Sequence, residues 1–283
     1  MSVNRIPKRL LDGGRYFEAP RWHDNRLWLV DCMARTLLSL SPSGERSEHA
    51  KFDDTPCGTG VLPDGRFVVL TMFRKQLWTY RDSRLSPYAD LSSIAAGTID
   101  DMIVDGLGRA WVGDLGFDMP PPADRSAVGR IILVLPDGQA RVVAEGLRFP
   151  NGIAVSPDHR RLVVAEMDGG CLADYDIADD GALTLRRRLG SFREPDGICL
   201  DAEGAVWVAS FSEDAFIRLD RDGQERERLS LPGRRAIACT LGGPYRRTLF
   251  CLTAETSPED LRQRKSTAYV DTVEVDVPGA GYP

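Results

Sequence analysis

The chain repeats six times a short apolar strand, a tight polar turn and a second apolar strand. Spacing this regular is typical of a radial repeat, in which each unit buries its apolar face against its neighbours. The second strands are 27–30, 67–70, 110–112, 162–165, 206–209 and 249–252. Successive units start 41, 42, 52, 44 and 43 residues apart, as measured between Trp22, Pro63, Asp105, Pro157, Asp201 and Pro244.

Two further strands complete each unit, as at 130–135 and 139–144 around the turn 136–138. About four strands per unit make the blade of a β-propeller. We therefore predict an all-β fold, a six-bladed β-propeller with four-stranded blades and a central metal site, formed by one domain over residues 1–283. The segment 268–277 alternates at period two and is expected to pair with an N-terminal strand, which would close the ring. Helix should be scarce.

Charge and cysteine content exclude several classes of function. The net charge of −6 gives no attraction to nucleic acid or to an anionic membrane surface. No apolar stretch approaches the roughly 18 residues of a membrane span, and the N-terminus lacks a secretory signal, so a cytoplasmic protein is expected. The six cysteines show no C-x-x-C spacing, which favours reduced thiols. We expect a monomer or a homodimer.

One register of the repeat carries Glu18, Asp100, Asn151 and Asp196, each just ahead of the first strand of its unit. The first strand of a propeller blade lines the central channel, so these side chains should meet at the axis. A single Asn-Gly or Asp-Gly pair is more often a turn, but four polar residues in one register favour a site.

Carboxylates gathered in a partly dry channel repel one another unless a cation is present. Oxygen ligands suit a hard divalent ion, with Ca²⁺ first and Mg²⁺, Mn²⁺, Zn²⁺ or Fe²⁺ as alternatives. The three histidines, His23, His49 and His159, lie in or beside polar turns, so a histidine-based triad is not supported.

Three strings then resemble the SMP-30/gluconolactonase/LRE family: Glu18-Ala-Pro-Arg-Trp, Pro150-Asn-Gly-Ile-Ala and Pro195-Asp-Gly-Ile-Cys. The resemblance covers nearly the whole chain. It implies a six-bladed propeller with an axial divalent cation held by Glu18, Asn151 and Asp196. It also implies lactone hydrolysis, with Asp196 as the general base.

The chain departs from that family where the substrate would lie. Asp100-Asp101 replaces a typical Asn-Asp pair, and Thr98 stands where the sugar-lactone members have an arginine. We expect Asp100 either to complete the set of ligands around the cation or to orient the water molecule that attacks the substrate. Asp101 is expected to support Asp100. The other expected substrate contacts are Thr98, Glu166, Met72, Arg74, Phe211 and the Pro-rich loop 116–129, whose apolar members indicate a substrate less polar than a sugar acid.

The sequence thus predicts a metal-dependent hydrolase acting on a small lactone or similar cyclic ester. Two alternatives stay open. One is a phosphotriesterase-like hydrolase at the same site, and the other is a non-enzymatic calcium-binding or interaction propeller.

Overall fold

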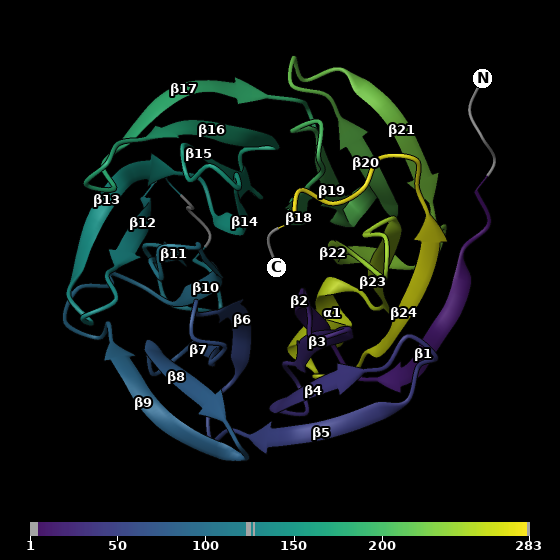
Figure 1. The fold of residues 1–283 in the computed structure, drawn as a ribbon, viewed down its shortest axis with the longest axis horizontal. Helices are drawn as coiled ribbons and strands as arrows, with labels where there is room; N and C mark the ends of the chain where they lie inside the picture. Colours follow the sequence, from purple (N-terminus) through teal and green to yellow (C-terminus); the bar gives the residue numbers. More distant parts are fainter. Residues whose placement is uncertain (1–4, 123–125, 127, 282–283) are drawn as a thin grey trace.

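The computed structural model describes residues 5–122, 126 and 128–281. Its strands form six antiparallel four-stranded sheets arranged around one axis, which confirms the predicted propeller (Figure 1). Figure 1 looks along this axis, with the innermost strand of each sheet near the centre and the outermost on the rim. The expected loop 116–129 includes residues 123–125 and 127, which lie outside the described residues.

The first three blades run outward from the axis in chain order. Blade 1 consists of β2 (Phe17–His23), β3 (Arg26–Asp31), β4 (Thr36–Leu40) and β5 (Arg46–Lys51). Blade 2 consists of β6 (Pro56–Val61), β7 (Phe67–Thr71), β8 (Gln76–Arg81) and β9 (Arg84–Asp90). Blade 3 consists of β10 (Ile99–Val104), β11 (Ala110–Asp114), β12 (Gly129–Val134) and β13 (Ala140–Leu147).

The last three blades include the ring closure. Blade 4 consists of β14 (Pro150–Val155), β15 (Arg161–Glu166), β16 (Cys171–Ile177) and β17 (Leu183–Leu189). Blade 5 consists of β18 (Pro195–Leu200), β19 (Val206–Ser210), β20 (Ala215–Leu219) and β21 (Glu225–Ser230). Blade 6 consists of β22 (Arg235–Gly242), β23 (Thr248–Glu255), β24 (Thr267–Glu274) and the N-terminal β1 (Lys8–Gly14).

The antiparallel pairing of β1 with β24 joins the two ends of the chain in one sheet, as the alternating segment 268–277 predicted. In the described part of the chain, helix is limited to a 3₁₀ turn (Phe211–Glu213) and α1 (Pro258–Arg262), and neither could cross a membrane. All six cysteines are free.

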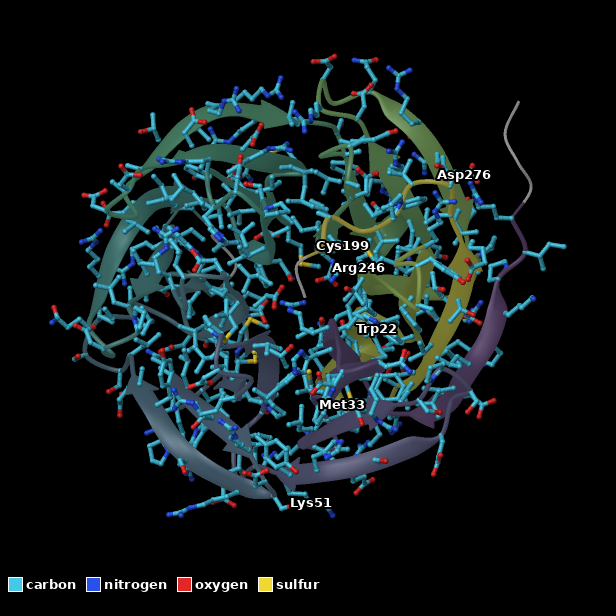
Figure 2. All side chains as sticks on the ribbon, viewed as in Figure 1. Trp22, Met33, Lys51, Cys199, Arg246 and Asp276 are labelled. Atoms are coloured by element: carbon cyan, nitrogen blue, oxygen red, sulfur yellow. The ribbon has the colours of Figure 1, made fainter. Side chains whose placement is uncertain are left out.

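Burial follows the strand order within each blade. The second strands are almost fully buried, including Trp111 at 0% and Trp207 at 1% exposed, because neighbouring blades pack against both of their faces. Along the outermost strands, exposed and partly buried residues alternate or exposed residues predominate. These strands bring charged side chains such as Lys51 to the rim (Figure 2). The hydrophobic core is therefore a ring of packed layers around the inner strands.

The C-terminal segment crosses one end of the ring toward the axis (Figure 1). The N–H of Ala202 donates to the carbonyl of Pro278 at 2.8 Å, and the N–H of Ala280 donates to the carbonyl of Leu200 at 3.1 Å. These contacts lie at the far end of β18 from Asp196. The segment thus covers the end of the central channel opposite the acidic register.

Candidate active site

The four polar residues of the repeat register lie at equivalent positions on four inner strands. Glu18, Asp100, Asn151 and Asp196 are each the second residue of β2, β10, β14 and β18. The expectation that they precede these strands is corrected, because pairing begins one residue earlier. Cys57 of β6 and Ile237 of β22 occupy the corresponding places in blades 2 and 6.

A β-bulge shapes the inner strand at this register. In β18, Pro195 pairs with Ser210 and Ile198 with Val208, so the inner strand has one residue more than its partner over this span. The same shift occurs in β14, between Pro150 and Ile153. A bulge bends the strand and re-aims the side chain within it.

The glycines after Asn151 and Asp196 serve packing between blades and not turn formation. A Cβ on Gly152 would lie 2.4 Å from the carbonyl oxygen of Asp196. A Cβ on Gly197 would lie 2.5 Å from the Cβ of Ala238 in β22. Neighbouring inner strands therefore approach at the height of the register, which brings its side chains together.

The carboxylates of the register, together with Asp101, form an acidic cluster in which the charged state is unfavourable. Burial, followed by the charges of Asp100 and Asp101, raises the pKa of Asp196. Burial and then Asp196 raise the pKa of Glu18. Burial and neighbouring Asp101 raise the pKa of Asp100 to about 7, and burial raises the pKa of Asp101 to about 6. Each shift records the cost of a carboxylate placed near others away from water.

The donor set fits a hard divalent cation. Oδ1 of Asp196 is buried without a hydrogen-bond partner among the described residues, which is costly for a charged oxygen. The Asn151 amide nitrogen points to Met167 Sδ at 3.7 Å, which leaves its carbonyl oxygen for another partner. With half-buried Glu18, the set consists of oxygens alone.

Within the described residues, no group of three or more histidine, cysteine, aspartate or glutamate side chains is arranged to hold a metal ion. The set of Glu18, Asn151 and Asp196 contains only two such residues, because its third member is an amide. The central metal site therefore stays a prediction.

Arg21 lies buried beside Asp101 and bonds to the inner strands of two neighbouring blades. Its guanidinium donates to the carbonyls of Met102 at 2.6 Å and Thr59 at 3.2 Å and lies 3.6 Å from Asp101 Oδ1. Arg21 is 4% exposed and Asp101 8% exposed, so the pair is buried. Asp101 also accepts the N–H of Met102 at 2.7 Å, which ties it to the floor of the site. Sequence reasoning missed Arg21, although it stands three residues after Glu18.

Two predicted substrate contacts are engaged with the protein itself. Glu166, 1% exposed, accepts the N–H of Arg148 at 2.8 Å and pairs with Arg188 at 2.7 Å. Thr98 is 1% exposed, and its hydroxyl accepts the N–H of Met119 at 3.0 Å. Both arrangements favour anchoring of the rim over contact with a ligand.

The remaining predicted contacts lie on the rim. Met72 is half-buried, Arg74 is exposed and Phe211 is buried beneath the guanidinium of Arg235 at 5.6 Å. In the described part of the loop 116–129, Phe117 packs edge-on against Phe149 with ring centroids 5.8 Å apart. This apolar pair borders the Asn151 strand.

Two rim residues beside the acidic cluster were not predicted. Glu194 raises the pKa of Asp196, after larger contributions from burial, Asp100 and Asp101, and accepts a hydrogen bond from the Ser212 hydroxyl. Tyr16 stands two residues before Glu18, as Glu194 stands two before Asp196. That shared register position is the signal that would have found both.

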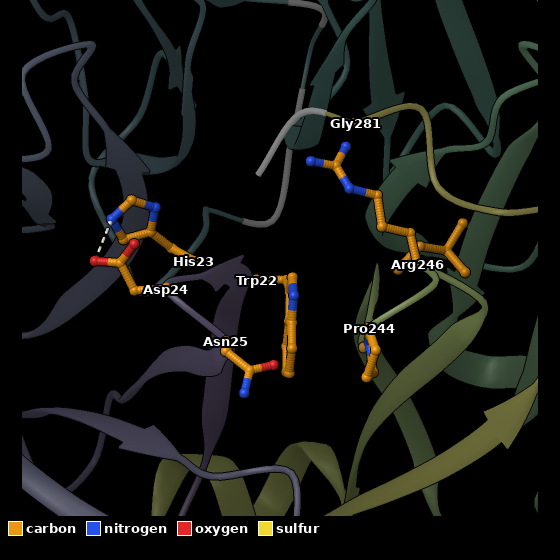
Figure 3. A pocket seen from close by; sticks show the side chains of 9 residues that line it. Trp22, His23, Asp24, Asn25, Pro244, Arg246 and Gly281 are labelled. Atoms are coloured by element: carbon orange, nitrogen blue, oxygen red, sulfur yellow. Dashed lines mark ion pairs between the residues drawn. The ribbon is translucent and has the colours of Figure 1, made fainter.

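A cavity of about 340 Å³ lies at the other end of the hairpins, between blades 1 and 6. Trp22 and His23 at the end of β2 line it, together with Arg246 from the β22–β23 turn (Figure 3). Its walls do not include the acidic cluster. The cavity and the acidic cluster are therefore separate features of the molecule.

The fold and the site define a six-bladed propeller with an acidic cluster on one side of its axial channel. The SMP-30/Gluconolactonase/LRE-like region matches residues 17–255, and the chain belongs to this family. It is 31% identical over 277 residues to 6-deoxy-6-sulfogluconolactonase of Pseudomonas putida, with 94% of this chain and 93% of that protein covered. It is 26% identical over 247 residues to pentonolactonase XacC of Haloferax volcanii, with 85% and 82% covered.

Solved structures share the fold. A calcium-binding protein, regucalcin, from Agrobacterium tumefaciens superimposes with a TM-score of 0.80 at 20% identity, covering 99% of this chain and 97% of that chain. At this level of identity the likeness supports the architecture alone.

Proposed function

We propose that this protein is a metal-dependent hydrolase that opens a lactone, a small cyclic ester. The observation that carries the proposal is the buried, unpartnered Oδ1 of Asp196 within a cluster of four carboxylates and one amide. The lactonases among its relatives support lactones as the substrate class.

Glu18, Asn151 and Asp196 would hold one divalent cation, with Ca²⁺ the first expectation. When bound, such a cation polarises a carbonyl group and stabilises negative charge developing on its oxygen. Half-buried Asp100, whose charge contributes to the raised pKa of Asp196 after burial, would orient the attacking water or complete the set of oxygen ligands.

Asp196 is proposed as the general base. A carboxylate accepts the proton of a water molecule as that water's oxygen attacks the carbonyl carbon. In the metal-free protein, burial and then the charges of Asp100 and Asp101 raise the pKa of Asp196. The ester C–O bond then breaks, and the product is a hydroxy acid.

The test is a chelation and substitution experiment on the purified protein. Removal of divalent ions should abolish hydrolysis of a lactone panel, and Ca²⁺ or Mn²⁺ should restore it. Asp196→Asn should lower kcat by at least about 10²-fold because loss of a general base typically costs this much, while circular dichroism stays unchanged.

Asp64→Asn, in an exposed turn, is the matched control and should retain full activity. Full activity of Asp196→Asn would contradict the base assignment. Binding of calcium without turnover of any lactone would favour the binding-protein alternative, and turnover of phosphotriesters alone would favour the phosphotriesterase alternative.

A further inference from the structure

Arg21 is a buried cation on the inner strand that carries Glu18. It is the fifth residue of β2 and is 4% exposed. A buried guanidinium is costly unless its nitrogens have hydrogen-bond partners. Here Nε donates to the carbonyl of Thr59 at 3.2 Å, Nη1 to that of Pro20 at 2.8 Å and Nη2 to that of Met102 at 2.6 Å. One rigid, planar group therefore joins the three inner strands β2, β6 and β10.

A second hydrogen bond between β6 and β2 runs in the opposite direction. The hydroxyl of Thr59, which is 0% exposed, donates to the carbonyl of Ala19 at 2.6 Å. Ala19 has a φ of 49°, in the left-handed region that residues other than glycine rarely adopt, and its N–H donates to Glu18 Oε2 at 3.3 Å. The bonds from Thr59 and Arg21 thus hold β6 against the part of β2 that carries Glu18.

Asp101 extends this network to the inner strand of blade 4. Its Oδ1 lies 3.6 Å from Nη2 of Arg21, and its Oδ2 accepts the N–H of Ile153 at 3.4 Å. Asp101 directly follows Asp100 in β10, and Ile153 stands two residues after Asn151 in β14. The buried pair of Arg21 and Asp101 therefore links the four inner strands β2, β6, β10 and β14.

We propose that Arg21, together with Thr59, positions the cation site by fixing the separation of the strands that carry Glu18, Asp100 and Asn151. This inference rests on the proposed function. Ligands from separate strands bind one cation tightly only when those strands are held at fixed distances, and residues behind the ligands supply that support. Arginine suits this role because its planar fork donates in several fixed directions, whereas a lysine ammonium donates from a single point.

The experiment measures cation binding to Arg21→Lys and to the unchanged protein by isothermal titration calorimetry, with calcium chloride and manganese chloride as probes. Lysine keeps a positive charge beside Asp101, so a change in affinity reports the lost hydrogen-bond geometry and not a lost charge. We expect the dissociation constant of the cation to rise by about 10–100-fold, as is usual when residues that support metal ligands are replaced. Circular dichroism should show the same folded structure for both proteins.

Arg109→Lys is the matched control, because Arg109 is 6% exposed and pairs with buried Asp105 at 2.7 Å in the turn between β10 and β11. This variant should have a lower unfolding midpoint but a cation dissociation constant within about twofold of that of the unchanged protein, as expected for a distant site. An unchanged affinity of Arg21→Lys, or an equal loss of affinity in both variants, would overturn the inference by showing that Arg21 serves stability alone.

Thr59→Val is a second variant that decides the question even if Arg21→Lys does not fold. It removes the hydrogen bond to Ala19 and keeps the shape of the side chain. We expect the dissociation constant to rise by about fivefold, since a single hydrogen bond is lost, and an unchanged affinity would overturn the inference. If the unchanged protein bound neither ion, the proposed metal-dependent function would be contradicted, and the inference would fall with it.

Discussion

At the scale of single residues, the buried carboxylates differ in whether their oxygens have hydrogen-bond partners. Asp31, Asp114 and Glu166 are buried where the second strands end, and each accepts backbone N–H groups from neighbouring loops. Asp196, equally buried, has one oxygen with no such partner among the described residues. Burial of an acidic residue is therefore not sufficient to mark a site, and the unsatisfied oxygen is the stronger signal.

Glu166→Gln tests this distinction. The change removes the charge that pairs with Arg188 and leaves an amide where both carboxylate oxygens had accepted hydrogen bonds. Since Arg188 is partly exposed, we expect a loss of about 1–3 kcal/mol in the free energy of unfolding, measured in urea. The kcat and KM of the folded fraction should be unchanged. Lower activity at unchanged stability would restore Glu166 as a substrate contact. Glu259→Gln, on exposed α1, serves as the control.

At the scale of elements, the strands and their order could be predicted because the apolar alternation and the turn residues repeat six times. The register of Glu18, Asn151 and Asp196 followed from the same repeat. The bulges could not be predicted, since Asn-Gly and Asp-Gly have the same local appearance in a turn and in a strand that packs against a neighbour. Arg21 was missed for a related reason: its contacts with Thr59 and Met102 join blades far apart in sequence.

Gly197→Ala tests the close approach of the inner strands. The new methyl would lie 2.6 Å from Cα of Ala238, a backbone atom that cannot move aside freely. We expect a loss of about 1–3 kcal/mol of stability and a lower kcat, because relief of the overlap displaces Asp196. Gly138→Ala, in an open turn with φ +85°, is the comparison, since it introduces backbone strain without a close contact. Equal kcat values for both variants would contradict the role of Gly197 in positioning Asp196.

At the scale of the whole molecule, ring closure concentrates the acidic residues. The pairing of β1 with β24 fixes blade 6 beside blade 1, and Arg21 and the C-terminal segment cover the channel below the cluster. Within the described residues, the carboxylates of Glu18, Asp100, Asp101 and Asp196 then share one channel with the buried Arg21. The cost of that arrangement is borne by the folded protein alone, because an unfolded chain separates the charges. That all 283 residues form one domain stays a prediction.

This cost predicts how the stability of the metal-free protein depends on pH. The pKa of Asp100 is raised from 3.8 to about 7 in the folded state, and that of Asp101 from 3.8 to about 6. Between about pH 4 and about pH 7 the folded state thus binds more protons at these groups than the unfolded state, so their contribution to stability is lost as pH rises.

We therefore expect Asp100 and Asp101 to make the unfolding midpoint higher at about pH 5.5 than at about pH 8. The midpoint is measured by calorimetry in excess chelator. Asp100→Asn removes one charge from the cluster and should raise the midpoint at pH 8 while flattening the pH dependence. Addition of calcium at pH 8 should raise the midpoint of the unchanged protein, because a cation that binds only the folded state stabilises it. If the unfolding midpoints of the variant and the unchanged protein changed with pH in parallel, Asp100 would not be repelled by the other carboxylates, and the prediction would be wrong.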